Sequence, residues 1–477
     1  MQLSDLDATA CAELVRTGAV SPGELVDAAI LRIRASNDEL GAVIYPMFDE
    51  ARATQPAPGP FRGVPILIKD LNQHVANTPH TQGLQPLSGY RTPRDSHVVA
   101  TLRRAGFVIV GKTNTSELGI VPTTESLAWP PTRNPYDLAR SPGGSSGGSA
   151  CAVATGMVPV AHATDTGGSI RIPASCCGLY GLKPSRGRVS YAPTFGDLHG
   201  GLVCDHVVTR SVRDSAAILD LISGPQPGDP YAAPTQLTPY LAELASPHRQ
   251  LRIAFATEFV GPDGVLVDSH PDCVAAVAHA ANLLAALGHV VEPAHIPTLR
   301  EPAWAARFLT IWAAGIATDV HEAGHAIGRP IGNHEVEVLT WALAELGRLI
   351  SGPAYSEAWR WLQRAARRIA EFWSTYDVWL TPTITSPPLP LGAFRSPPDD
   401  PLAALFTAAR LTPFTTPFNV TGQPACSVPL SRNADGLPIG VQLVGAYGRE
   451  DLLLRLSAQL EAAHPFVHAA TRHYSQA

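Results

Sequence analysis

Residues 140–175 read RSPGGSSGGSACAVATGMVPVAHATDTGGSIRIPAS, and this segment decides both the fold and the chemistry expected of the chain. It contains two glycine-rich runs, each with serine, on either side of an apolar stretch. The apolar stretch predicts a short helix over 150–156 followed by a buried strand over 158–161. The glycine-rich runs should therefore lie at the ends of regular elements, and not in a flexible linker.

Helices and apolar strands alternate on both sides of this segment, which is typical of an α/β protein with a mostly buried sheet. The second N-terminal helix should begin at Ser21, because Ser21, Pro22 and Glu24 form an N-terminal capping pattern. The other expected elements are strands over 64–68, 107–111, 251–256, 378–380 and 436–445, and helices within 4–35 and over 94–105, 272–287, 304–322, 354–376 and 449–463. Proline-rich patches at 55–60, 225–240 and 382–401 are interpreted as surface connections within one domain, 1–477.

The composition indicates a globular protein: 45% of the 477 residues are hydrophobic and 16% are charged. A net charge of −6 gives no basic surface for nucleic acid. The acidic N-terminus is unlike a secretory signal, and no apolar run is long enough for a membrane span. Seven cysteines without a CxxC pair indicate buried thiols, with no metal site and a cytoplasmic location.

Only three of the 35 basic residues are lysines: Lys69, Lys112 and Lys183. A buried lysine can lose its proton near neutral pH, whereas arginine cannot. Lys69 follows a predicted strand, where loss of solvation lowers its pKa toward that of a general base. Asp70 should point to the opposite face, so it need not keep Lys69 protonated. The alternative interpretation is a lysine that extends from a strand end to solvent.

The first glycine-rich run, Gly143 to Gly148, surrounds Ser145 and Ser146 and fits the elbow of a serine esterase in spacing. An elbow needs a preceding strand, however, and Pro135 and Pro142 occupy that region instead. The run also lacks the Lys-Ser/Thr ending of a nucleotide-binding loop.

The second run, Asp165 to Ser169, is predicted as a tight turn after a strand. Its small residues leave several backbone N–H groups free to converge on an anion, as an oxyanion hole beside a serine nucleophile requires. A glycine turn with a helix-capping serine is the alternative.

The chain closely resembles the amidase signature family in three features taken together: Lys69, the PGGSSGG motif and the TDTGGSIR motif. The resemblance also includes GKTNTSELG (111–119) and PFNVTGQPACSVPL (417–430), and it covers most of the chain. The 24-residue spacing of Ser145 and Ser169 matches the family. Within the family, the chain is most similar to 6-aminohexanoate-cyclic-dimer hydrolases and related actinobacterial amidases.

The resemblance implies a mixed, twisted sheet covered by helices on both faces. It implies a catalytic core at about 60–225 and 376–465 and a variable substrate-side region at about 225–375. The implied activity is hydrolysis of linear or cyclic carboxamides of small molecules, with no cofactor and no metal. Family habit also suggests a homodimer.

Carried over by position, Ser169 is the implied nucleophile, Ser145 the bridging serine after a cis peptide bond, and Lys69 the neutral base. The implied oxyanion-hole donors belong to Thr166, Gly167, Gly168 and Ser169. Ser146, Asp165 and Arg171 are expected to brace these loops, and Lys112 and Lys183 to be structural. His162 is expected to be a core or surface histidine and not part of a Ser-His-Asp triad.

Four tryptophans are candidates for an apolar substrate pocket: Trp129, Trp304, Trp312 and Trp341. Aromatic residues at helical spacing are also common in cores, so this assignment is a hypothesis. Two further alternatives are the glutaminase subunit of a tRNA-dependent amidotransferase, which would need a partner, and a non-catalytic binding protein.

Overall fold

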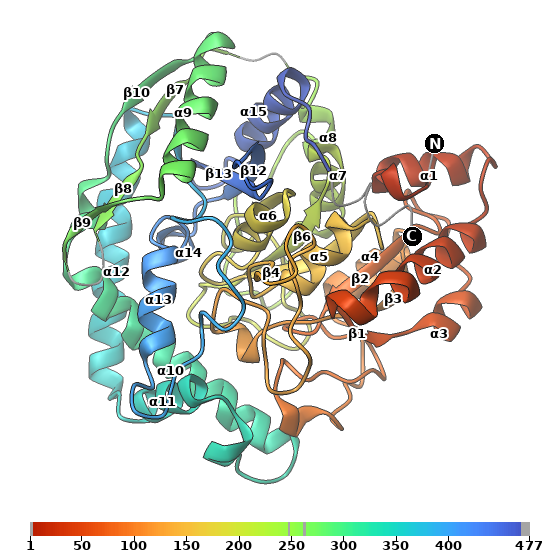
Figure 1. Cartoon of the computed structure of the whole chain (residues 1–477), viewed down its shortest axis with the longest axis horizontal. Coiled ribbons are helices and arrows are strands. Elements are labelled where there is room, and N and C mark those ends of the chain that lie inside the picture. Colours follow the sequence, from red (N-terminus) through yellow and green to blue (C-terminus); the bar gives the residue numbers. More distant parts are fainter. Residues whose placement is uncertain (1–2, 247–248, 261–263, 469–477) are drawn as a thin grey trace.

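A mixed sheet of eleven strands runs through the molecule (Figure 1). The computed structural model describes residues 3–246, 249–260 and 264–468. In spatial order the strands are β1 (Val43–Pro46), β3 (Val108–Thr113), β2 (Pro65–Lys69), β4 (Val160–Asp165), β6 (Cys204–Thr209), β5 (Tyr180–Lys183), β12 (Ala425–Arg432), β13 (Pro438–Gly445), β11 (Val378–Pro382), β7 (Arg252–Phe255) and β10 (Val290–Pro293). A separate pair contains β8 (Glu258–Val260) and β9 (Leu266–Asp268). Pairing of β5 with β12 joins the early and late parts of the chain in one sheet.

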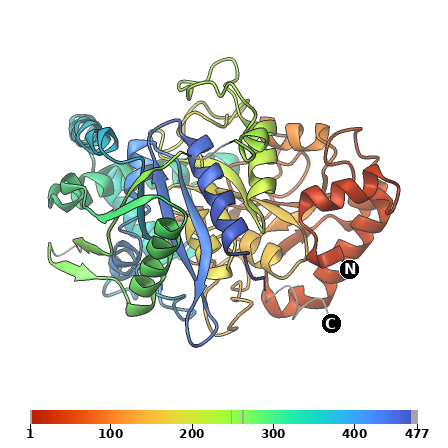
Figure 2. The same ribbon diagram turned by 90° about the horizontal axis from the view of Figure 1, so that it is seen from above.

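Helices lie on both faces of this sheet, as the view from above shows (Figure 2). They are α1 (Ala8–Arg16), α2 (Pro22–Leu40), α3 (Phe48–Ala53), α4 (His97–Arg104), α5 (Gly147–Ala154), α6 (Arg171–Cys177), α7 (Val212–Ile222), α8 (Tyr240–Glu243), α9 (Pro271–Ala286), α10 (Ala303–Ala326), α11 (Val338–Arg348), α12 (Gly352–Ala370), α13 (Ala403–Leu411), α14 (Pro417–Thr421) and α15 (Glu450–Ala463). Short 3-10 helices are η1 (Leu3–Asp5), η2 (Gln85–Leu87), η3 (Glu117–Gly119), η4 (Pro297–Arg300), η5 (Asn333–Glu335) and η6 (Glu371–Ser374). Within the described ranges, no helix is both long enough and apolar enough to cross a bilayer.

Strand β2 illustrates why the sheet is buried on both faces. All five of its residues are buried, and successive side chains point to opposite faces. Ile66 and Ile68 join a core that includes α4, α7, α9 and α15, whereas Leu67 joins a second core with α2 and α5. An apolar run without polar alternation is what such a two-sided environment requires. The strand therefore delivers Lys69 into a buried position at its end.

The structure confirms the predicted α/β class and most of the longer elements. Ser21 caps α2, and Glu24 completes the capping box. The predicted helix over 354–376 ends earlier, because α12 stops at Ala370 and η6 follows. Several short elements were not predicted, among them β1, β5, β6, β12 and α6. In β12, Pro429 lies where the register shifts between Val428 and Ser431, which hides the strand in the sequence pattern.

Close packing of α10 against α11 gives a test of the fold. A Cβ atom on Gly347 would lie 2.1 Å from the carbonyl oxygen of Ala313, so even alanine must push the helices apart. We expect Gly347→Ala to lower the free energy of unfolding by about 1–3 kcal/mol, the usual cost of overpacking. The matched control is Gly23→Ala in α2, where nothing lies within 4 Å of the added atom. Denaturant unfolding of both variants checks this, and equal stabilities would contradict it.

Candidate active site

Lys69 ends β2 in a fully buried position between two hydroxyl groups. Its Nζ lies 2.7 Å from Ser145 Oγ and 2.7 Å from Thr164 Oγ1. Burial lowers the pKa of Lys69 to about 7, although the carboxylates of Asp205 and Asp165 oppose this shift. A substantial fraction of the amine is therefore neutral at pH 7 and able to accept a proton. The contact of Lys69 with Thr164 was not predicted from the sequence. A polar residue within a buried strand could have indicated it.

Ser145 is held in a tightly packed loop before α5. The expected cis peptide bond joins it to Gly144. A Cβ atom on Gly144 would lie 1.9 Å from the carbonyl oxygen of Thr123, so this position accepts only glycine. Ser146 contacts the end of β4, because its Oγ donates to the Thr164 carbonyl at 3.2 Å. The loop therefore presents Ser145 to Lys69 while Ser146 ties it to the neighbouring strand.

Ser169 lies between β4 and α6, on the wall of a cavity of about 500 Å³. Its side chain is mostly buried, with 8% of the residue exposed. Gly119 lines the same cavity, and a Cβ atom there would lie 3.1 Å from Ser145 Oγ. The Lys69–Ser145 pair thus adjoins the cavity wall that carries Ser169.

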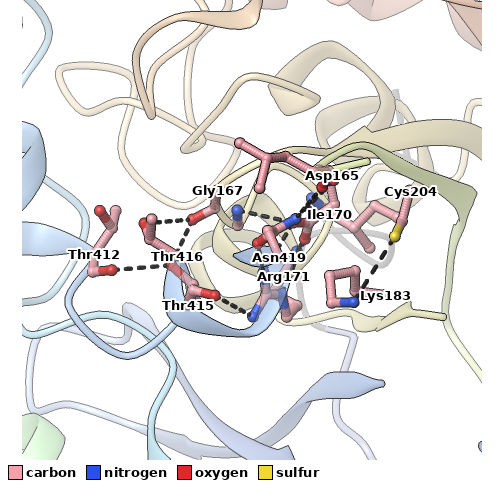
Figure 3. Close-up of polar contacts among 12 residues, drawn as sticks. Asp165, Gly167, Ile170, Arg171, Lys183, Cys204, Thr412, Thr415, Thr416 and Asn419 are labelled. Atoms are coloured by element: carbon pink, nitrogen blue, oxygen red, sulfur yellow. Dashed lines mark hydrogen bonds and ion pairs between the residues drawn. The ribbon is translucent and has the colours of Figure 1, made fainter. Parts of the chain in front are cut away.

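An ion pair between Asp165 and Arg171 braces the turn that carries Ser169 (Figure 3). Burial alone would raise the pKa of Asp165, but the Arg171 charge and hydrogen bonds lower it to about 2. The carboxylate also accepts from the N–H groups of Gly168 at 2.8 Å and Ile170 at 3.1 Å. Arg171 reaches Asn419 Oδ1 at 2.7 Å, so the turn is fixed to α14. Both residues occupy the bracing positions expected of them.

The expected oxyanion donors are only partly available. In the described part of the chain, no acceptor takes the N–H of Thr166, Gly167 or Ser169. The Gly168 N–H is instead engaged by Asp165, which corrects the expected donor set. Gly168 has φ +133°, and a Cβ atom there would lie 2.6 Å from both Ile172 and Thr415. Its role is therefore to shape the turn.

The other two lysines and His162 have structural surroundings, as predicted. Lys112 forms a buried ion pair with Asp70, so Asp70 is turned away from Lys69. Lys183 donates to the Pro184 carbonyl at 2.8 Å. His162 is buried and lies 3.3 Å from Asp205, not hydrogen-bonded to Ser169.

Two of the four predicted pocket tryptophans line the cavity. Trp304 and Trp312 do so from α10. Trp129 does not, because its indole donates to Thr81 Oγ1 at 3.2 Å in another loop. Trp341 does not either, because it lies on α11 and packs with the Arg348 guanidinium 5.0 Å from its ring centre. For these two residues the prediction is wrong.

The cavity wall is mostly apolar. Glu301 is the one charged residue among the described residues that line it, and Arg368 pairs with it at 2.8 Å. Sequence reasoning missed most of the wall, which includes Ile172, Phe308, Leu309, Leu402, Leu405 and Phe406. Their apolar character alone could not distinguish them from core residues.

Comparisons with known proteins agree with this geometry. Residues 24–454 match the sequence model of the family described as Amidase. The chain is 44% identical to a 6-aminohexanoate-cyclic-dimer hydrolase of Pseudomonas sp. (strain NK87), over 97% of this chain and 95% of that protein. A solved structure of 6-aminohexanoate cyclic dimer hydrolase complexed with substrate superposes with a TM-score of 0.94 at 41% identity, covering 98% of each chain. A glutamyl-tRNA(Gln) amidotransferase subunit from Thermotoga maritima is more distant, with a TM-score of 0.76 at 29% identity over 98% of this chain and 96% of that chain.

The fold, the family match and the similar hydrolases thus define a hydrolase of carbon–nitrogen bonds. The chain belongs to the amidase family.

Breaking the Asp165–Arg171 pair tests the brace. We expect Arg171→Met to lower the free energy of unfolding by about 3–5 kcal/mol, because a buried carboxylate loses its partner. Reaction of Ser169 with a fluorophosphonate should also slow by at least about 100-fold, since a displaced catalytic group has costs of that order. The rate is followed by intact-protein mass spectrometry.

The matched control is Arg188→Met, which breaks another buried ion pair, that of Arg188 with Glu450 at 2.9 Å. It should lose similar stability and keep its labelling rate within a few-fold. Equal loss of labelling in both variants would show that the effect is only a loss of stability.

Proposed function

We propose that this amidase hydrolyses uncharged amides of aliphatic amino acids, cyclic dimers of the 6-aminohexanoate type included, through an acyl-enzyme on Ser169. The observation that carries the proposal is the 2.7 Å contact between Lys69 Nζ and Ser145 Oγ, fully buried beside the cavity that contains Ser169. A neutral amine in contact with one serine, beside the cavity wall that carries a second, can activate a nucleophile through a relay. The names of the similar proteins support the choice of substrate.

In the acylation step, one proton moves from Ser169 to Lys69 through Ser145 and then passes to the leaving amine. Ser169 Oγ attacks the amide carbon and gives its proton to Ser145 Oγ, while Ser145 gives its own to Lys69 Nζ. The N–H groups of Thr166, Gly167 and Ser169 donate to the oxyanion of the tetrahedral intermediate. As the C–N bond breaks, the Lys69 ammonium returns the proton through Ser145 to the leaving amine. Water then attacks the ester by the same relay, which releases the acid and restores Ser169.

The cavity favours an uncharged acyl group. Its walls offer methylene and aromatic surface from Trp304, Phe308 and Leu405, which matches an aliphatic chain. The carboxylate of Glu301 is already paired with Arg368, so neither offers a free partner to a charged substrate. A substrate with an ammonium or carboxylate near the amide would have to bury that charge unpaired, which is costly.

The first test concerns the base and the nucleophile. A fluorophosphonate should label Ser169, and Lys69→Ala should slow the labelling by about 10³-fold or more, as removal of one member of a catalytic unit does. Only the neutral amine accepts the proton, and the pKa of Lys69 is about 7. The rate should therefore fall about tenfold per pH unit below pH 7 and stay level above it.

Labelling of Ser145 or Ser146 would instead support the esterase elbow. A rate that stays level through acid pH would contradict a neutral lysine base. Ser169→Ala is the control that should show no labelling.

The second test concerns the substrate. Hydrolysis of 6-aminohexanoate cyclic dimer, hexanamide and glutamine is compared by kcat/KM. We expect the two uncharged amides to exceed glutamine by at least about 100-fold, because an unpaired buried charge costs several kcal/mol. Preference for glutamine would favour the glutaminase alternative and contradict the substrate class proposed here.

A further inference from the structure

Asp205 lies beside the catalytic lysine, although the reaction described above gives it no role. It is fully buried on β6, and in the antiparallel register its partner on β4 is Thr164. Directly opposed residues of two strands project their side chains from the same face, with Cβ atoms about 4.5–5.5 Å apart. Thr164 Oγ1 accepts the hydrogen bond from Lys69 Nζ. The Asp205 carboxylate therefore stands on the face of the sheet that Lys69 reaches.

Hydrogen-bonding side chains surround this carboxylate, and its one ion-pair candidate among the described residues is a histidine, His162. Gln73 Nε2 donates to Oδ2 at 2.7 Å, and Asn72 Nδ2 donates to Oδ1 at 3.4 Å. The Tyr191 hydroxyl lies 3.4 Å from Oδ1, and His162 Nε2 lies 3.3 Å from Oδ2. No lysine or arginine within the described ranges forms an ion pair with it. The donors from Gln73, Asn72 and Tyr191 suit an ionised carboxylate, which only accepts.

The second carboxylate near Lys69 is in a different position. Asp165 is paired with Arg171, so much of its charge is offset by a guanidinium. Asp205 has no such partner, and its field acts on Lys69 without that cancellation. Titratable groups on the elements around Lys69 include Asp70 directly after β2 with its partner Lys112 on β3, His162 and Asp165 on β4, Cys151 on α5, Arg171 on α6, Cys204, Asp205 and His206 on β6, and Tyr191 in the loop after β5.

We propose that Asp205 is a positioning residue for the Lys69 base: its carboxylate stabilises the ammonium that Lys69 becomes each time it takes the serine proton. Through Asn72 and Gln73 the same carboxylate also holds the loop that directly follows Lys69. This inference rests on the proposed function, because it assumes that Lys69 is the base. Without Asp205, the arginine-paired Asp165 is the remaining carboxylate that opposes the effect of burial on the ammonium, and the lysine would be a weaker base.

The test is the pH dependence of fluorophosphonate labelling of Ser169 in Asp205→Asn. Removing the negative charge disfavours the ammonium, so neutral Lys69 should persist to lower pH. The midpoint of the acid limb should move down by about one pH unit or more, the size expected for a nearby charge at an effective dielectric constant of about 20. The rate on the plateau should fall several-fold, because a weaker base removes the proton less readily. A midpoint equal to that of the wild type would overturn the proposal.

Three further variants separate charge from structure. Asp205→Glu keeps the charge, and its midpoint should stay within about 0.3 units of the wild type. Gln73→Met removes a loop contact but keeps the charge, and its midpoint should also stay in place; a shift as large as in Asp205→Asn would mean that loop movement, not charge, is responsible. Should Asp205→Asn fail to fold by circular dichroism, Asp205→Ser, which is smaller and equally uncharged, is measured instead.

Lys69→Ala distinguishes failure of this inference from failure of the proposed function. If Lys69→Ala labels at the wild-type rate, the serine-lysine mechanism itself is wrong. If Lys69→Ala is inactive and Asp205→Asn shows no shift, only the role of Asp205 is wrong.

Discussion

The arrangement of the site depends on the buried ion pair of Arg171 and Asp165. Arg171 is the first residue of α6 and Asp165 the last of β4, so the pair spans the turn that carries Ser169. The same guanidinium donates to Gln442 Oε1 at 2.8 Å and to the Thr415 carbonyl at 3.0 Å. It therefore joins β4 to β13 and α14, which come from the end of the chain. A buried pair of this kind adds little net stability, but it fixes a single geometry because every alternative leaves a charge without a partner.

The three lysines show how one side-chain type is adapted to three buried positions. The ammonium of Lys112 pairs with the carboxylate of Asp70, and that of Lys183 donates to the backbone carbonyl of Pro184. Among the described residues, Lys69 has two hydroxyl groups within hydrogen-bonding distance, and its two carboxylate neighbours act without direct contact. Burial penalises the charged form in all three, and the contacts decide how much of that penalty is offset. The lysine proposed as the base is thus one of the two whose hydrogen-bond partners in the described part of the chain are uncharged, whereas Lys112 contacts a carboxylate.

Sequence reasoning predicted those features that depend on local patterns or on short motifs. The apolar run before Lys69, the capping box at Ser21 and the two glycine-rich turns all have a local cause, and each lies where it was expected. Features that depend on contacts between distant segments were not predictable in this way. Trp312 lines the cavity and Trp341 does not because of how α10 and α11 pack, and both are apolar residues on helices. Likewise, the Gly168 N–H points to Asp165 through the shape of the whole turn, which spacing alone does not describe.

The cavity and the proposed catalytic residues come from separate stretches of chain. Lys69, Ser145 and Ser169 lie within the first third or so of the sequence, whereas most of the cavity wall comes from 299–312 and 402–417. The earlier part of the chain contributes a few small or apolar residues to the cavity wall, near Gly119 and Ser169. Changes in the later segments can therefore alter the shape of the cavity without disturbing the proposed catalytic residues. In evolutionary terms, new specificities in such an enzyme can arise by drift or exchange of α10 and α13 while the chemistry is inherited unchanged.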